Sequence, residues 1–455
     1  MSEALTHSLA AFVSELRLAA VPANALTVVH TGFADCVGTM IAGSVEDPPN
    51  ILHNTLAPAA GDASLYLTGP RVPAPDAAWI NATAAHALDY DDVALRGHPS
   101  TVLVPAILAE GESLGATGAQ LATAYVVGYE VWAELIGRDL AQHHQKGWHP
   151  TGIFGPIAAA AACASLRGFD SDKAAQAIAL GASHSSGLVA NFGTMTKPYH
   201  AGRAAHSGVI AARLAAAGFT ASPDALEHPL GFLAAISPKG EVDRVSPAKV
   251  GQEWQILKQG LSVKKYPLCY CTHRAIDGML DLLAQQTVRP DDVESIRVST
   301  SRRNATILRN SRPQTGLEAK FSMQFAMASS IVARRVGLAE LTDPFVQRSD
   351  IQALMPKVTV EPDDRDDPKR PGDAPFDLVM IKTRDGRRLA SARIADARGS
   401  PDQPLSTEEL WAKFASCLSV GNPKLKARTV FDALIQIERQ PSVAALRSSG
   451  ETASG

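Results

Sequence analysis

Residues 377–395 read DLVMIKTRDGRRLASARIA and form the clearest β-hairpin pattern in the chain. The two runs meet at Asp385-Gly386, a dipeptide that is favoured in the tight turns of hairpins. Before this hairpin, ESIRVSTS (294–301) alternates β-branched with polar residues, and KVTVEPD (357–363) is another strand pattern. Helical patterns accompany these strands over 273–286 and 318–337. We therefore expect an α+β domain.

On both sides of this domain the chain has helical patterns. The clearest long buried helix is TGAQLATAYVVGYEVWAELIGRDL (117–140), and Ser406 with Glu409 forms a capping-box pattern at a later helix start. The fold class is thus mainly α with an inserted α+β domain. The helical domain comprises residues 1–262 and 396–445, the smaller α+β domain 263–395, and residues 446–455 are expected to form a disordered tail.

Length and composition exclude several classes of protein. The chain has 455 residues, which favours two domains, and 45% of them are hydrophobic. A net charge of −3 gives no basis for binding nucleic acid or an anionic membrane surface. No run of about eighteen uninterrupted apolar residues predicts a membrane span, and the N-terminus has the pattern of an amphipathic helix rather than a signal peptide. Five scattered cysteines indicate a reducing compartment, so we expect a cytoplasmic protein.

HALDYDDVALRGHPS (86–100) concentrates three aspartates and two histidines between apolar helical flanks. A metal site, a helix-terminus turn and an acid/base site are the competing explanations. Asp89, Asp91 and Asp92 lack the DDxxD spacing of magnesium-dependent terpenoid synthases, and they lack the loop pattern of an EF-hand. Cys269, Cys271 and His273 lack the second ligand pair of a structural zinc site. We therefore predict that no metal binds at these residues. Each aspartate taken alone could be explained by capping of a helix end.

The same design recurs in three further segments. Each places a titratable residue near a proline before a helix: KGWHPTGIFGP (146–156), TMTKPYHAGRAAHSG (194–208) and SVKKYPLCYCTHRAID (262–277). Helix N-termini carry partial positive charge and free N–H donors, which favour carboxylates. If the four segments converge, they form a pocket suited to a small di- or tricarboxylate. Such a pocket also suits removal of a proton next to a carboxylate, with cations stabilising the enediolate.

These motifs, taken in this order over nearly the whole chain, resemble the MmgE/PrpD family. That family includes 2-methylcitrate dehydratase, cis-aconitate decarboxylase and iminodisuccinate epimerase. The resemblance implies a large helical domain built from both chain ends and a smaller α+β lid. It also implies a homodimer, an active site between the domains and catalysis without a cofactor.

The resemblance also assigns site residues. It implies five catalytic residues: Asp89, His98, His149, Lys197 and Lys264. It leaves three substrate-binding candidates: Lys265, His200 and His273. Lys197 is the candidate to bind or protonate a carboxylate, and His98 or His149 is the candidate base. Asp89 either orients a histidine or acts as a base itself, and Lys265 remains an alternative to Lys264.

The reaction expected first is dehydration of the 2-methylcitrate type, with iminodisuccinate-type epimerisation and cis-aconitate-type decarboxylation as alternatives. Two departures from the family pattern concern tyrosines. Gln145 stands where several members have one, and VSTSRRNATIL (298–308) lacks the one that the decarboxylases use near the lid strands.

A different class of function is also open. A non-catalytic helical interaction protein would not bring the four motifs together, and a magnesium-dependent terpenoid enzyme would need a second acidic helix. The acid/base enzyme predicts convergence of the motifs.

Overall fold

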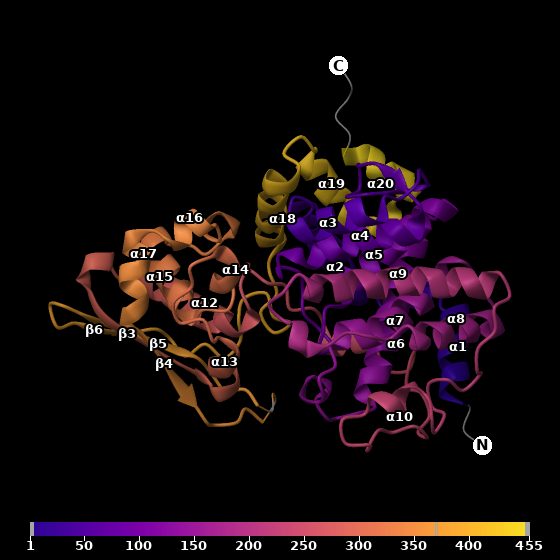
Figure 1. The fold of residues 1–455 in the computed structure, drawn as a ribbon, viewed down its shortest axis with the longest axis horizontal. Coiled ribbons are helices and arrows are strands. Elements are labelled where there is room, and N and C mark those ends of the chain that lie inside the picture. The colour runs from indigo at the N-terminus through magenta and orange to yellow at the C-terminus, as the bar shows by residue number, and fades with distance from the viewer. Residues whose placement is uncertain (1–3, 369, 371, 451–455) are drawn as a thin grey trace. The chain divides into compact units, whose positions relative to one another are not determined.

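The computed structural model describes residues 4–368, 370 and 372–450. It divides into two compact units, one formed by the described residues of 4–262 and 406–450 and the other by those of 263–405. The first unit is helical apart from one short strand pair, and the second combines helices with a small sheet (Figure 1). A mainly helical chain with an inserted α+β unit is what the sequence predicts.

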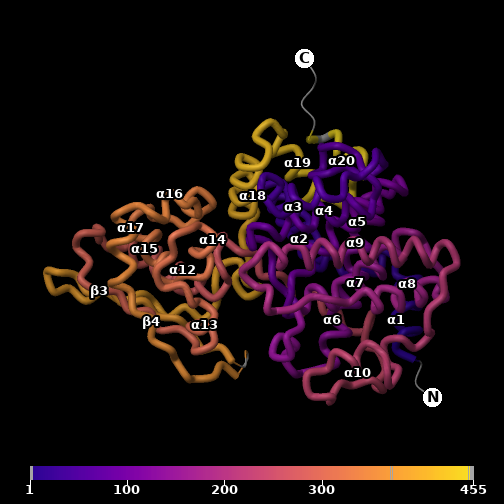
Figure 2. Tube along the Cα trace, viewed as in Figure 1, coloured from indigo at the N-terminus to yellow at the C-terminus, as the bar shows by residue number. Residues whose placement is uncertain are grey.

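The helical unit draws its helices from both ends of the chain, and α18 packs against α2 (Figures 1 and 2). Its N-terminal helices are α1 (Leu5–Glu15), α2 (Ala23–Gly43), α3 (Asp47–Leu56), α4 (Ala74–Ala87), α5 (Pro99–Leu114), α6 (Gly118–Gly137), α7 (Pro150–Leu166), α8 (Ser171–Ser183), α9 (Thr196–Ala216), α10 (Phe232–Ile236) and α11 (Gln255–Gln259). Its C-terminal helices are α18 (Thr407–Gly421), α19 (Ala427–Leu434) and α20 (Val443–Gly450). Strands β1 (Ala63–Ser64) and β2 (Arg71–Val72) pair antiparallel.

Close helix packing fixes α9 against α4 and α7. A Cβ atom on Gly202 would lie 2.1 Å from Oγ1 of Thr83 on α4, and one on Gly208 would lie 2.3 Å from Cβ of Ala159 on α7. Real Cβ atoms do not approach so closely, so these positions need glycine for the backbones to meet. The start of α9 is thereby held beside the end of α4.

Helix α2 is long and apolar enough to cross a membrane, but 72% of its apolar window is buried inside the unit. Asp35, in the middle of α2, has a fully buried carboxylate that forms an ion pair with Lys413 of α18 at 2.5 Å. The helix therefore has the environment of a core helix.

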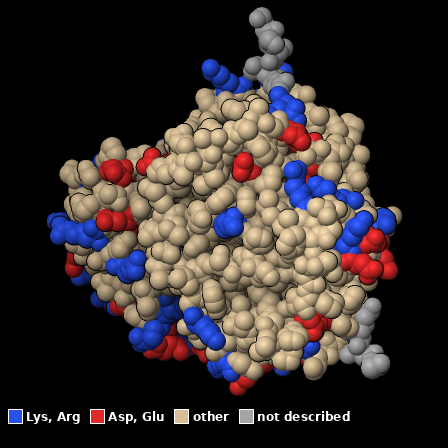
Figure 3. All heavy atoms as spheres, turned by 45° about the vertical axis from the view of Figure 1, so that its right-hand side comes forward, with Lys and Arg blue, Asp and Glu red and all other residues tan. Residues whose placement is uncertain are grey.

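On the face shown in Figure 3, basic and acidic side chains are interspersed, without a broad field of one sign.

The α+β unit contains a four-stranded sheet in the order β4-β3-β5-β6. The strands are β3 (Val293–Ser301), β4 (Val358–Asp363), β5 (Leu378–Thr383) and β6 (Arg388–Ala390); β3 runs parallel to β4 and antiparallel to β5. Helices α12 (His273–Gln285) and α15 (Met323–Ala333) pack on the sheet, and shorter helices are α13 (Arg302–Ile307), α14 (Gly316–Ala319), α16 (Asp343–Val346) and α17 (Ser349–Leu354). The predicted hairpin is confirmed, with Gly386 at a φ of 89° in the turn between β5 and β6.

Three predicted boundaries differ from the structure. The chain returns to the helical unit at Ser406 rather than at residue 396, because Arg398 binds Asp277 and Asp281 of α12 within the α+β unit. The helix predicted over 318–337 is interrupted, because the Ser322 side chain caps a new helix start at α15. Residues 446–450, predicted as part of a disordered tail, belong to α20, and residues 451–455 lie outside the described residues. The capping box at Ser406 is confirmed.

Candidate active site

The stretch 86–100 folds as a helix end, a turn and a helix start. His86 lies in the last turn of α4, and the Asp89 N–H donates to the His86 carbonyl at 3.1 Å. Asp89 has a φ of 51°, and Leu95 and Arg96 also have positive φ. Aspartate tolerates this left-handed conformation, but leucine and arginine rarely adopt it, so the loop is strained at Leu95 and Arg96. His98 then occupies the N-cap position of α5, before Pro99.

The other two motifs of the helical unit begin helices in a related way. His149 occupies the N-cap position of α7 before Pro150, and its N–H donates to the Gly187 carbonyl at 3.1 Å. Lys197 lies inside the first turn of α9, because this helix begins at Thr196 and not after the Lys-Pro pair. His200 follows on the same helix. Proline suits the first turn because its nitrogen has no hydrogen to satisfy there.

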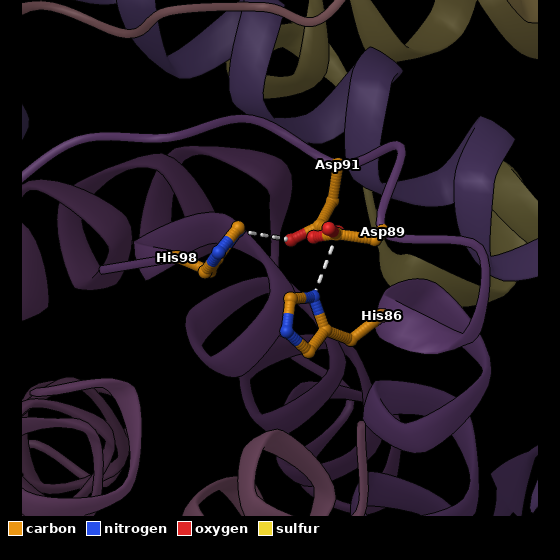
Figure 4. Close-up of side chains that lie close together, drawn as sticks. All are labelled: His86, Asp89, Asp91 and His98. Atoms are coloured by element: carbon orange, nitrogen blue, oxygen red, sulfur yellow. Dashed lines mark hydrogen bonds and ion pairs between the residues drawn. The ribbon is translucent and has the colours of Figure 1, made fainter. Parts of the chain in front are cut away.

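Asp91 bridges two imidazoles (Figure 4). Its Oδ1 lies 2.8 Å from Nδ1 of His86, and its Oδ2 lies 2.9 Å from Nδ1 of His98. The same Nδ1 of His98 lies 2.9 Å from the Asp92 carbonyl. Carboxylate and carbonyl oxygens only accept, so both histidines carry hydrogen on Nδ1. In the neutral form the lone pair of each ring is then on Nε2.

Lys197 and Asp89 form an ion pair across the two motifs. Nζ of Lys197 lies 2.7 Å from Oδ1 of Asp89, and both side chains are largely buried. The ammonium also lies 5.5 Å from the centre of the Phe192 ring. A cation is thereby held beside the histidines, where it can attract a carboxylate.

Four imidazoles form a continuous row. The His86 ring centre is 4.3 Å from that of His98 and 6.4 Å from that of His149. Nδ1 of His149 lies 3.1 Å from Nδ1 of His200, so one ring donates and the other accepts. The motifs around 86–100, 149 and 197–200 therefore converge in the helical unit.

The environment of this row keeps most of its rings neutral. Burial lowers the pKa of His86 to about 3, although the Asp91 charge opposes this. Burial, followed by the charge of Lys197, lowers the pKa of both His149 and His200. Burial alone would raise the pKa of Asp91, but the two imidazoles beside it lower that pKa well below its usual range. The site thus has proton acceptors near a fixed cation.

A second buried network of polar side chains anchors the loop between α4 and α5. Lys413 of α18 donates to the Tyr90 carbonyl at 2.7 Å while it pairs with Asp35. Asp92 accepts from the Ser100 hydroxyl, which lies 2.7 Å from the Tyr125 hydroxyl. Burial raises the pKa of Asp92 well above its usual range. A helix from the C-terminal end of the chain therefore anchors a loop from its N-terminal part.

The fourth motif belongs to the α+β unit. Lys264 is buried, Lys265 is half-buried, and His273 is buried at the start of α12 with Nε2 3.3 Å from the Leu268 carbonyl. Their part in the site stays a prediction.

Sequence reasoning missed His86 and Asp91 as site residues. Both lie within the quoted stretch, but the chain turns between them at Asp89, so their spacing does not reveal that they face each other.

His86, Asp89, Asp91 and His98 also form a group of possible metal donors within 4.8 Å of one another. Their arrangement fits a metal ion poorly. Both Asp91 oxygens lie at hydrogen-bond distance from an imidazole, and an ammonium group lies against Asp89. A divalent ion would have to displace that ammonium, the hydrogen bond between His86 and Asp91, and the ion pair between His98 and Asp91.

Comparisons with known proteins agree with this organisation. The MmgE/PrpD N-terminal domain matches residues 7–245, and the MmgE/PrpD C-terminal domain matches residues 266–435. The cis-aconitate decarboxylase of Homo sapiens is 28% identical over 385 residues, which cover 81% of this chain and 76% of that enzyme. The enzyme of Mus musculus is also 28% identical, with 81% and 75% covered. That of Aspergillus terreus is 22% identical, with 81% and 80% covered.

Proposed function

The chain belongs to the MmgE/PrpD family, and on this premise we propose that it is an enzyme that moves a proton at a carbon next to a carboxylate of a small di- or tricarboxylate. The observation that carries the proposal is the arrangement of His98. Its Nδ1 hydrogen is donated to the Asp92 carbonyl and lies beside the Asp91 carboxylate, which leaves Nε2 as the basic atom. Lys197 is the cation for the substrate carboxylate.

Dehydration of a 2-methylcitrate-type acid is the first candidate reaction. Lys197 and the starts of α5 and α7 attract the substrate carboxylates. Nε2 of His98 takes the proton from the carbon, and the electron pair of the C–H bond moves toward the neighbouring carboxylate. A carbon–carbon double bond forms as the C–O bond breaks. The leaving hydroxide takes a proton from solvent and departs as water, and His98 releases the proton that it took to solvent.

Decarboxylation of cis-aconitate is the second candidate, because the relatives that align with 81% of this chain are named for it. A carbon–carbon bond would break and release CO2, the electron pair would pass into the remaining conjugated acid, and a carbon would then take a proton. The family resemblance implies a tyrosine near the lid strands in decarboxylases, and residues 298–308 contain none, which favours the dehydratase.

Product analysis separates the two candidates. Purified protein treated with a chelator is incubated separately with 2-methylcitrate, cis-aconitate and iminodisuccinate, and products are identified by NMR. An unsaturated tricarboxylate from 2-methylcitrate supports the dehydratase. CO2 release from cis-aconitate supports the decarboxylase. No change in any of the three acids, with folded protein, counts against both.

The homodimer and the roles of Lys264, Lys265 and His273 are carried by the family resemblance. Sedimentation velocity tests the first, and single alanine substitutions that leave the fold intact test the second.

A further inference from the structure

We propose that His86 is a specificity-determining residue, whose Nε2 accepts a hydrogen bond from a hydroxyl group of the bound polycarboxylate. The inference rests on the proposed function and narrows its substrate class to hydroxy acids. Asp91 is the positioning residue that aims this acceptor.

The two ring nitrogens of His86 differ in their hydrogen bonding. Nδ1 donates to Oδ1 of Asp91 at 2.8 Å, and Figure 4 shows the other ring nitrogen turned away from Asp91. Nε2 is buried and has no hydrogen-bond partner among the described residues. Buried acceptors in folded proteins are nearly always paired, so this atom calls for a donor that the described part of the chain does not supply.

The His86 ring lies inside the row of imidazoles. It lies between His98 and His149, with ring centres 4.3 and 6.4 Å away, and the Lys197 ammonium acts on it electrostatically. A substrate that is bound by Lys197 and deprotonated by His98 therefore lies beside His86.

The substrate has to supply the hydrogen-bond donor for Nε2 of His86. Ionised carboxylates only accept hydrogen bonds, so they cannot pair with a neutral imidazole nitrogen that also only accepts. Among the groups of a small hydroxy acid, the hydroxyl is the donor. A site that leaves a buried acceptor unpaired discriminates strongly against a ligand that lacks the donor.

Citrate and tricarballylate test this directly, because they differ only in the hydroxyl group on the central carbon. Isothermal titration calorimetry on the wild-type protein should give at least about tenfold tighter binding of citrate. In His86→Phe the two ligands should bind with equal affinity. His206→Phe, on α9 but outside the row of four rings, should keep the wild-type preference.

Equal affinity of the two ligands for the wild-type protein would overturn the inference and would mean that the donor is an ordered water molecule. This comparison does not depend on the variant being folded. Binding of neither ligand, together with no turnover of any acid, would overturn the proposed function and the inference with it. Turnover of 2-methylcitrate with equal binding of the two ligands would overturn the inference alone.

Discussion

Lys197 and Asp89, which are 108 positions apart in the chain, meet in an ion pair with 2.7 Å between Nζ and Oδ1. Close packing of α9 on α4 through Gly202 places the two residues together. Lys197→Met should lower turnover by about 100-fold or more, because the cation beside the substrate carboxylate is lost. Steady-state kinetics measures this, with Lys173→Met, an exposed lysine on α8, as the matched control. A variant that keeps wild-type turnover would contradict the role of Lys197.

His98→Asn should lower kcat by about 10²- to 10⁴-fold, the range for loss of a general base. The His98 side chain makes no capping hydrogen bond in α5, and asparagine is a good N-cap residue. The variant loses the buried contacts of the His98 ring with Asp91 and the Asp92 carbonyl, so urea unfolding should show a cooperative transition with a loss of about 1–3 kcal/mol. A variant that does not fold would point to a structural role instead.

Asp91→Asn should change the hydrogen position on one imidazole. The amide presents one oxygen and one NH2 group, so one of His86 and His98 then faces a donor and must accept at Nδ1. In ¹⁵N-histidine NMR, the spectrum of the variant should show one ring with hydrogen on Nδ1 fewer than that of the wild-type protein. An unchanged spectrum would show that Asp91 does not set these tautomers.

Stability should depend on pH through His86. Its folded-state pKa of about 3 lies below that of an unfolded histidine, about 6.5, so the unfolded chain binds the proton first as the pH falls. The contribution is complete above the unfolded value and is lost toward lower pH, by about 1.4 kcal/mol per pH unit between the two values.

His86→Phe should therefore show a shallower fall of the unfolding free energy between about pH 6 and about pH 4. Glu130 and Asp377, whose pKa burial raises to about 7, act in the opposite sense but are common to both proteins. Urea unfolding at several pH values gives the slopes, and Lys173→Met should keep the wild-type slope. Parallel slopes for wild type and His86→Phe would refute the assignment.

Lys413→Met should destabilise the helical unit by about 3–5 kcal/mol, because it leaves the buried Asp35 carboxylate without its partner. Adding Asp35→Asn should restore part of the loss, since no charge is then left unpaired. Urea unfolding of both variants checks this. Equal destabilisation in the single and double variants would show that the ion pair itself contributes little to the loop anchor.

Local patterns in the sequence predict much of this fold. Apolar residues at helical spacing predict α2 and α6, and Asp385-Gly386 predicts the turn between β5 and β6. The His-Pro pairs predict that His98 and His149 begin helices, because proline is tolerated at the first helical position.

What the sequence does not reveal depends on contacts between distant segments or on unusual backbone. The positive φ of Asp89 turns the chain so that Asp91 faces back toward His86; aspartate tolerates this conformation, but the sequence does not mark which of the three aspartates adopts it. Residues 396–405 carry no strand or helix pattern that assigns them to a domain. Arg398 assigns them through its ion pairs with α12.

Deuterium incorporation from D2O tests the central claim most directly. The chelator-treated wild-type protein and His98→Asn are each incubated with 2-methylcitrate in D2O and followed by proton NMR. The account predicts dehydration or exchange of a proton next to a carboxylate in the wild type, and a loss of that signal by about 10²-fold or more in the variant. Equal rates in the two proteins, or no proton transfer by the wild type with any small polycarboxylate, would contradict it.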